Sequence, residues 1–252
     1  CLLKLMRMTE HFDLNWSMLK IDRDLSLKIV KLGLPSGLTQ AIFSLAMIVV
    51  QSLTNSFGEM VIACNVIVMR IDGFAMMPNF SFGSAMTTFT GQNIGAKKME
   101  RVELGMKHGT IMAVSVSTIL TILLLLFGRP VMAVFTDTPE LVDLSIRMLK
   151  ILAVGYIAVA VTQSLSGVMR GAGDTMTPMW ISLIVTVGLR VPLAYGIAYA
   201  TRSPLYPTGR PESTFVSLLV AWILGAAITY AFYRKGAWRD KGINQQAAKE
   251  AA

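Results

Sequence analysis

The sequence predicts an all-α integral membrane protein built as a bundle of six transmembrane helices. Of its 252 residues, 54% are hydrophobic and only 15% are charged, whereas soluble domains carry about 25% charged residues. The apolar residues are gathered in uncharged or nearly uncharged segments, and a segment of about 20 residues is long enough to cross a bilayer. Lys and Arg concentrate in alternate connecting segments, as they do in multi-pass membrane proteins.

The chain opens with a charged segment, residues 1–31, in which basic and acidic residues alternate with apolar ones. This charge density excludes a membrane span. We therefore predict a cytoplasmic amphipathic connector. Because the chain begins with Cys1 rather than with methionine, we also expect it to be a fragment of a longer protein.

Six apolar segments follow the connector. The spans are expected at about 32–58, 60–92, 109–128, 145–169, 175–201 and 213–233. The second segment is too long for one straight crossing, because a helix rises 1.5 Å per residue and the hydrocarbon core is about 30 Å thick. We expect Pro78 to kink this helix. Beyond the six-helix region, 32–233, the polar cytoplasmic tail 234–252 is not expected to pack.

The distribution of basic residues predicts the orientation. Six spans place both ends of this chain on one side of the membrane. Segments on that side hold 16 of the 23 Lys and Arg residues, the opposite loops hold 5, and Arg70 and Arg190 lie within spans. By the positive-inside rule, both ends are expected to be cytoplasmic. This pattern also explains the net charge of +8 without nucleic acid as a partner.

The sequence lacks the patterns of catalytic and metal-binding sites. The two cysteines cannot form a disulfide framework, and the two histidines have no metal-ligand spacing around them. Residues 91–95 are glycine-rich but do not make a phosphate-binding loop, because no Ser or Thr follows Lys97. We therefore expect no enzyme activity and no cofactor.

Arg70 and Asp72 are charged residues inside the second apolar segment. A charge at the bilayer centre costs about 2.5–3.5 kcal/mol on insertion scales, so it is retained mainly where it has a function. The two side chains point about 200° apart around a helix and need separate partners. Asp72 is the candidate for proton or cation coupling. In the alternative, Asp72 makes a polar contact between helices and Arg70 extends to the outer headgroups.

Other residues within the spans are candidates for lining a substrate cavity. Methionine suits a surface that accepts apolar molecules of different shapes, but it also fills gaps between helices. Hydrogen bonds between membrane helices average only about 0.6 kcal/mol, so packing alone also explains the polar residues. For Arg190, the alternative is snorkelling or a salt bridge within the bundle. The candidates are Arg70, Gln40, Asn55, Met76, Met77, Asn79, Gln163 and Arg190.

Two loop segments carry a resemblance to a known family. Residues 91–98 read Gly-Gln-Asn-Ile-Gly-Ala-Lys-Lys and end the second span. Residues 169–179 connect the fourth span to the fifth, and Asp174 or Thr177 can cap the helix that follows. With residues 34–37, Arg70–Phe74 and Pro78, these segments resemble the multidrug and toxic compound extrusion (MATE) transporters. The likeness extends over about residues 25–233 and is strongest to the NorM-like bacterial branch that includes the DNA-damage-inducible F type.

The resemblance implies one half of a larger transporter. The chain would be the C-terminal six-helix lobe of a twelve-helix MATE protein, in the inner (plasma) membrane of a bacterium. The N-terminal lobe, the lipid bilayer and drug-like small molecules would be its partners. The implied activity is secondary-active efflux of organic cations and amphipathic drugs in exchange for H⁺ or Na⁺.

The sequence differs from the family pattern at one point, and it leaves two alternative functions open. Some MATE members place cation-binding carboxylates on the first and fourth helices of this lobe, whereas residues 39–44 and 158–164 contain no acid. A lipid-linked oligosaccharide flippase of the same superfamily is one alternative, for which we expect a more basic cavity. A non-transporting membrane scaffold, or a lobe that works as a homodimer, is the other.

Overall fold

The computed structural model describes residues 23–239 as helices joined by short loops. The helices are α2 (Arg23–Asn55), α3 (Glu59–Gly95), α4 (Met99–Ala133), α5 (Pro139–Ala153), α6 (Gly155–Gly171), α7 (Met176–Leu183), the π-helix η2 (Ile184–Arg190), α8 (Val191–Ala200) and α9 (Glu212–Lys235). Five helical stretches are long and apolar enough to cross a membrane, and α5 with α6 makes a sixth if this bent pair is one span. The predicted all-α six-helix membrane bundle is confirmed.

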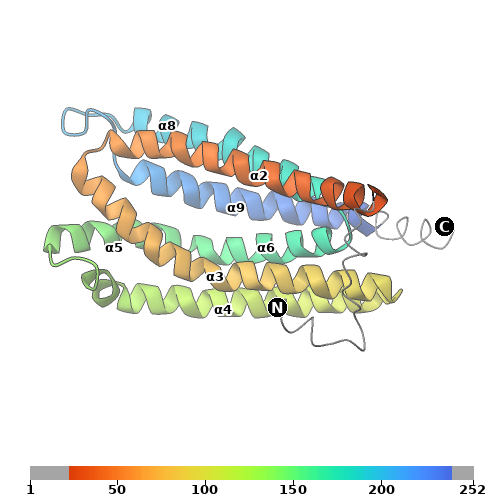
Figure 1. Cartoon of the computed structure of the whole chain (residues 1–252). Helices are drawn as coiled ribbons and strands as arrows, with labels where there is room; N and C mark the ends of the chain where they lie inside the picture. Colours follow the sequence, from red (N-terminus) through yellow and green to blue (C-terminus); the bar gives the residue numbers. More distant parts are fainter. Residues whose placement is uncertain (1–22, 240–252) are drawn as a thin grey trace, which may run out of the picture.

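The connecting loops gather at the two ends of an elongated bundle (Figure 1). Loops 96–98 and 172–175 lie at the same end as the start of α2 and the end of α9. Loops 56–58, 134–138 and 201–211 lie at the opposite end. This alternation follows from antiparallel packing of consecutive spans.

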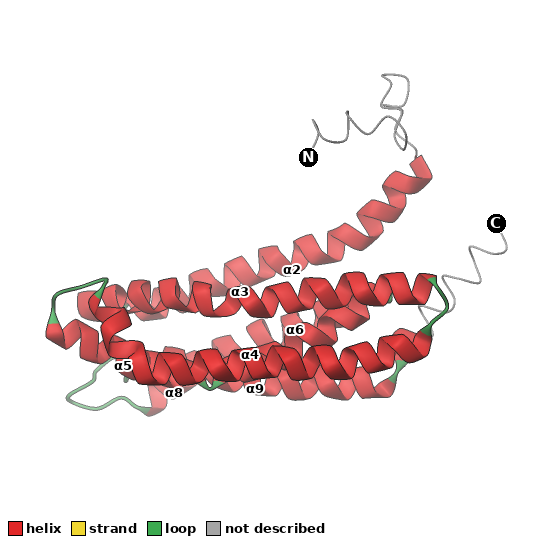
Figure 2. Ribbon diagram, turned by 90° about the horizontal axis from the view of Figure 1, so that it is seen from below, coloured by secondary structure: helices red, strands yellow, loops and turns green. Residues whose placement is uncertain are grey.

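The first helix begins earlier than the expected span. Helix α2 starts at Arg23, so residues 23–31 of the predicted connector are helical and continuous with the span; residues 1–22 lie outside the described residues. Its membrane-length apolar stretch starts at Gly37. Figure 2 shows the beginning of α2 diverging from the other helices. Large apolar side chains along α2, including Leu38 and Leu45, are consequently exposed within this chain.

Helix α3 runs for 37 residues and contains Pro78. Its two ends are inclined to each other in Figure 1, as we expected for a helix interrupted by proline. Helix α3 makes its most extensive contact with α6. There the backbones approach so closely that a Cβ on Gly167 would collide with the Gly83 carbonyl, and one on Gly171 with the Thr87 carbonyl. Small residues permit this approach between membrane helices.

The fourth span is broken between α5 and α6, where the chain bends by 42°. Backbone groups released by such a break need partners, because lipid offers none. The Thr121 hydroxyl donates to the Ala153 carbonyl at 2.8 Å, and the Asn79 amide donates to the Tyr156 carbonyl at 3.4 Å. Ser117 in turn donates to Asn79 Oδ1 at 2.6 Å. Side chains from α3 and α4 therefore stabilise the bend.

The fifth span contains a π-helical segment, η2, where a plain helix interrupted by Arg190 and Pro192 was expected. Proline has no N–H and clashes with the carbonyl four residues before it. A wider turn just before Pro192 relieves that clash. Such π segments are rare, and many lie at functional sites.

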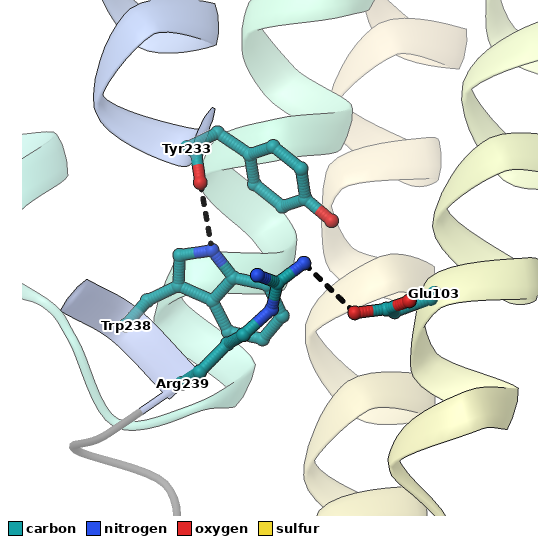
Figure 3. A network of polar contacts seen from close by, with 4 residues as sticks. All are labelled: Glu103, Tyr233, Trp238 and Arg239. Atoms are coloured by element: carbon teal, nitrogen blue, oxygen red, sulfur yellow. Dashed lines mark hydrogen bonds and ion pairs between the residues drawn. The ribbon is translucent and has the colours of Figure 1, made fainter. Parts of the chain in front are cut away.

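The residues after α9 pack against the bundle, whereas a polar tail without packed structure was expected from residue 234. Trp238 is only 1% exposed, and its indole N–H donates to the Tyr233 carbonyl at 3.1 Å. Arg239 pairs with Glu103 of α4 at 2.8 Å (Figure 3). The large apolar surface of one tryptophan outweighs the polarity of its neighbours. Residues 240–252 of the tail lie outside the described residues.

Candidate substrate cavity and buried charges

A cavity of about 450 Å³ lies among α2, α3, α6, the fifth span and α9. This volume is within the usual range for small-molecule sites. Its walls are largely apolar and aromatic, with Phe43, Phe80 and Trp222 among the lining residues. Side-chain amides and hydroxyls from α2, α6 and the fifth span make up the uncharged polar part of the lining: Thr39, Gln40, Thr162, Gln163, Ser182 and Thr186. The cavity therefore combines broad apolar contact with a few hydrogen-bonding groups.

Among the residues that the structure describes, Asp72 is the one charged residue that lines this cavity. Helix α3 brings its carboxyl group to the wall, where Oδ1 is buried without a hydrogen-bond partner among the described residues. The Tyr156 hydroxyl lies near the carboxyl group of Asp72. Arg190 is the basic group whose charge acts on Asp72. An acceptor in this position is available to a proton or to a cationic ligand.

The structure brings together four of the predicted site residues and separates the others. Asp72, Gln40, Met76 and Gln163 all line the large cavity. Arg70 and Met77 are exposed on other faces of α3, and Asn55 is exposed near the end of α2. None of these three lines the large cavity.

Asn79 is completely buried and does not line the cavity. Its side chain is occupied by the Tyr156 carbonyl and the Ser117 hydroxyl at the bend of the fourth span. The expectation that Asn79 contacts substrate is therefore replaced by a structural role. The sequence shows that Asn79 is a polar residue within a span, but it does not show that the fourth span is broken and contacts this side chain.

Arg190 is 4% exposed, so it does not snorkel to the membrane surface. No carboxylate of the described residues lies within 4.0 Å of its guanidinium, so it makes no close salt bridge either. Nη1 donates to the Met47 sulfur at 3.0 Å, and Nε has no partner among the described residues. Arg190 lines a separate, smaller cavity and not the large one.

Tyr156 and Trp222 lie near the Asp72 carboxyl group, and neither was among the candidates chosen from the sequence. Trp222 of α9 lines the large cavity and packs on Tyr156, with the ring centroids 5.9 Å apart. Gly155, at the bend of the fourth span, leaves room for the Trp222 ring, because a Cβ there would collide with it. Trp180 of the fifth span is 56% exposed. No local signal in the sequence distinguishes the two tryptophans.

Comparisons with known proteins agree on one family. Residues 35–196 match the family model described as MatE. Over 229 residues the chain is 27% identical to the probable multidrug resistance protein YoeA of Bacillus subtilis (strain 168), covering 90% of this chain and 48% of the relative. It is 22% identical to the probable multidrug resistance protein NorM of Thermotoga maritima, covering 86% of this chain and 45% of that relative. The chain thus spans about half the length of these relatives.

Solved structures show the same fold. A crystal structure of MATE in the bent conformation superposes with a TM-score of 0.80 at 20% identity, covering 92% of this chain and 50% of the other. The outward-facing conformation of a multidrug resistance MATE family transporter of the MOP superfamily gives 0.78 at 21% identity, covering 90% and 50%. Together with the match over residues 35–196, these likenesses establish that the chain belongs to the MATE family of membrane transporters.

Proposed function

We propose that this chain is the C-terminal six-helix lobe of a secondary-active multidrug exporter, which extrudes organic cations and amphipathic drugs in exchange for H⁺ or Na⁺. The half-length match to the two multidrug resistance relatives supports the proposal that a second lobe completes the transporter. Apolar side chains of α2 and α3 are exposed in this chain, and the second lobe and the lipid would cover them.

The observation that carries this proposal is the placement of one carboxylate in an aromatic cavity. Asp72 would attract a cationic group, while Phe43, Phe80 and Trp222 would contact the apolar body of the ligand. Aromatic faces also attract organic cations. Met76 would let the wall adapt to ligands of different shape.

The same cavity argues against the flippase alternative. A lipid-linked oligosaccharide carries phosphate, so its cavity should be rich in Lys and Arg. Within residues 23–239, the lining of the large cavity includes Asp72 and no Lys or Arg. Arg70 is exposed elsewhere and Arg190 lines a different cavity. The exporter is therefore the function that we favour.

We place the chain in a bacterial inner membrane with loops 96–98 and 172–175 in the cytoplasm. Lys97, Lys98 and Arg170 lie in or next to these loops, and Arg234 and Lys235 end α9 at the same end of the bundle. The positive-inside rule supports this orientation.

Transport by the complete two-lobe protein tests the proposed role of Asp72. Asp72→Asn keeps the size of the side chain but cannot exchange a proton or a metal cation. At each pH from about 6 to about 8, ethidium efflux by this variant is therefore expected to be at least tenfold slower than efflux by the wild type. Arg70→Gln is the matched control, because Arg70 lies on the same helix outside the cavity, and its efflux should stay near wild type. Wild-type efflux by Asp72→Asn over this range would remove Asp72 as the coupling residue.

A further inference from the structure

A second cavity, distinct from the large one, lies between α2, α3, η2 and the start of α9. Its volume is about 20 Å³, and a space of this size has room for one small molecule or ion. The polar residues that line it are Gln51, Thr54, Asn65, Arg190 and Thr214.

Arg190 supplies a positive charge to this cavity without a close counter-charge. The side chain is 4% exposed, and its Nε has no partner among the described residues. Its Nη1 donates to the sulfur of Met47, a weak acceptor. Asp72 acts on it from the large cavity, beyond salt-bridge distance. A buried guanidinium is costly unless it is paired and hydrogen-bonded.

The two amide side chains around Arg190 add hydrogen-bond donors. Asn65 Nδ2 donates to Gln51 Oε1 at 3.3 Å, and Gln51 Nε2 donates to Asn55 Oδ1 at 2.8 Å. Each amide nitrogen carries two N–H groups, and these bonds use one from each. The Thr54 hydroxyl, by contrast, is turned to the Val50 carbonyl at 3.0 Å. Asn65 and Gln51 are therefore able to donate to a species held beside Arg190.

The start of α9 contributes further positive potential. Thr214 lies in the first turn of this helix, and no side chain in the described part of the chain caps its N-terminus. Free N–H groups at a helix N-terminus favour negative charge. Glu212, the acid in this first turn, pairs with Arg147 at 3.7 Å and does not line the cavity.

We propose that this cavity binds a small monovalent anion, for which chloride is the natural candidate, held by Arg190 with the amides of Asn65 and Gln51. A water molecule would accept a hydrogen bond from Nε but would add no negative charge beside the guanidinium, whereas an anion supplies both the acceptor and the charge. The bound anion would join α2 and α3 to the π-helical segment of the fifth span. The proposal does not depend on the transport role proposed for Asp72, because it rests on a different cavity.

Thermal unfolding of the purified 252-residue chain in detergent tests the site. At constant ionic strength, replacing gluconate with chloride should raise the unfolding midpoint to a plateau, because a ligand that binds the folded state stabilises it by mass action. Arg190→Met should abolish the rise. Arg70→Met is the matched control and should keep it, since Arg70 is exposed and lines neither cavity. Equal midpoints in chloride and gluconate for the wild type, or the same rise in Arg190→Met, would overturn the proposal.

A second measurement covers the case in which Arg190→Met does not fold. Crystals of the wild-type chain grown in bromide should give an anomalous difference peak beside Arg190 Nε. Asn65→Leu, which removes one donor but keeps the charge, should weaken the chloride-dependent rise at least threefold in apparent affinity. Density beside Nε without an anomalous signal would identify water and refute the anion site.

Discussion

At the scale of single residues, the polar groups of the spans divide into those that stabilise the bundle and those that face a cavity. Asn79 and Asp72 lie seven residues apart on α3, yet Asn79 is fully buried against the bend of the fourth span while Asp72 reaches the large cavity. Hydrogen-bond partners, and not polarity, separate the two roles.

Replacing Asn79 should therefore destabilise the fold. Asn79→Ala removes a donor to the Tyr156 carbonyl and leaves the buried Ser117 hydroxyl without its acceptor, which is expected to cost about 1–3 kcal/mol. The thermal unfolding midpoint in detergent measures this loss. Asn55→Ala is the matched control, since Asn55 is exposed and should lose much less. Equal losses in the two variants would show that the bond to the bend contributes little.

At the scale of elements, contact between α3 and α6 depends on glycine. Gly167→Ala or Gly171→Ala would push the two backbones apart and is expected to destabilise the protein by about 1–3 kcal/mol. Gly73→Ala and Gly188→Ala have open space at the Cβ position and serve as controls. Unfolding midpoints that fall equally in all four variants would contradict a specific role for this contact.

The segment after α9 is a second element with a measurable contribution. Trp238 stacks on Tyr233 with ring centroids 5.2 Å apart, and Arg239 lies over its ring while reaching Glu103 (Figure 3). Trp238→Ala should cost about 3–5 kcal/mol, as expected for a fully buried tryptophan.

Chemical unfolding in detergent gives the size of this loss. Trp180→Ala provides the comparison, because Trp180 is 56% exposed and should lose far less. If the two variants unfold at the same denaturant concentration, Trp238 does not stabilise the end of the bundle.

The sequence predicted the membrane-spanning helices far better than it predicted the bend and the π-helical segment that interrupt two of them. Long uncharged segments mark spans because an exposed charge in lipid is costly, and this alone leads to the six-helix bundle. The bend between Ala153 and Gly155 depends on partners from α3 and α4, which local sequence does not reveal. The π-helical segment before Pro192 had a visible signal in that proline, but its wider turn did not follow from it.

Only part of the candidate site was predicted, because the sequence does not show which face of each membrane helix lines the cavity. Asp72, Gln40, Met76 and Gln163 were chosen as polar or flexible residues within spans, and they line the cavity. Met77, next to Met76, is 60% exposed. Hydropathy does not distinguish the face of a membrane helix that meets a cavity from one that meets lipid, since both are apolar. Tertiary packing decides between them.

At the scale of the whole molecule, the chain covers about half of the relatives that it matches. If a second lobe completes the exporter, this chain expressed alone should not confer resistance to ethidium, whereas the two-lobe protein should. Growth inhibition assays in an efflux-deficient bacterium compare the two at matched membrane expression. Resistance from this chain alone would favour assembly of two copies.

The most direct test of the account is the binding of an organic cation to the cavity that contains Asp72. Titration of the purified two-lobe protein with tetraphenylphosphonium, followed by calorimetry, measures this affinity. We predict that Asp72→Asn weakens binding at least tenfold, or about 1.4 kcal/mol. Arg70→Gln should leave the affinity unchanged, because Asp72 lines the cavity and Arg70 does not. Equal affinities of wild type and Asp72→Asn would contradict the assignment of this cavity as the cation-binding site.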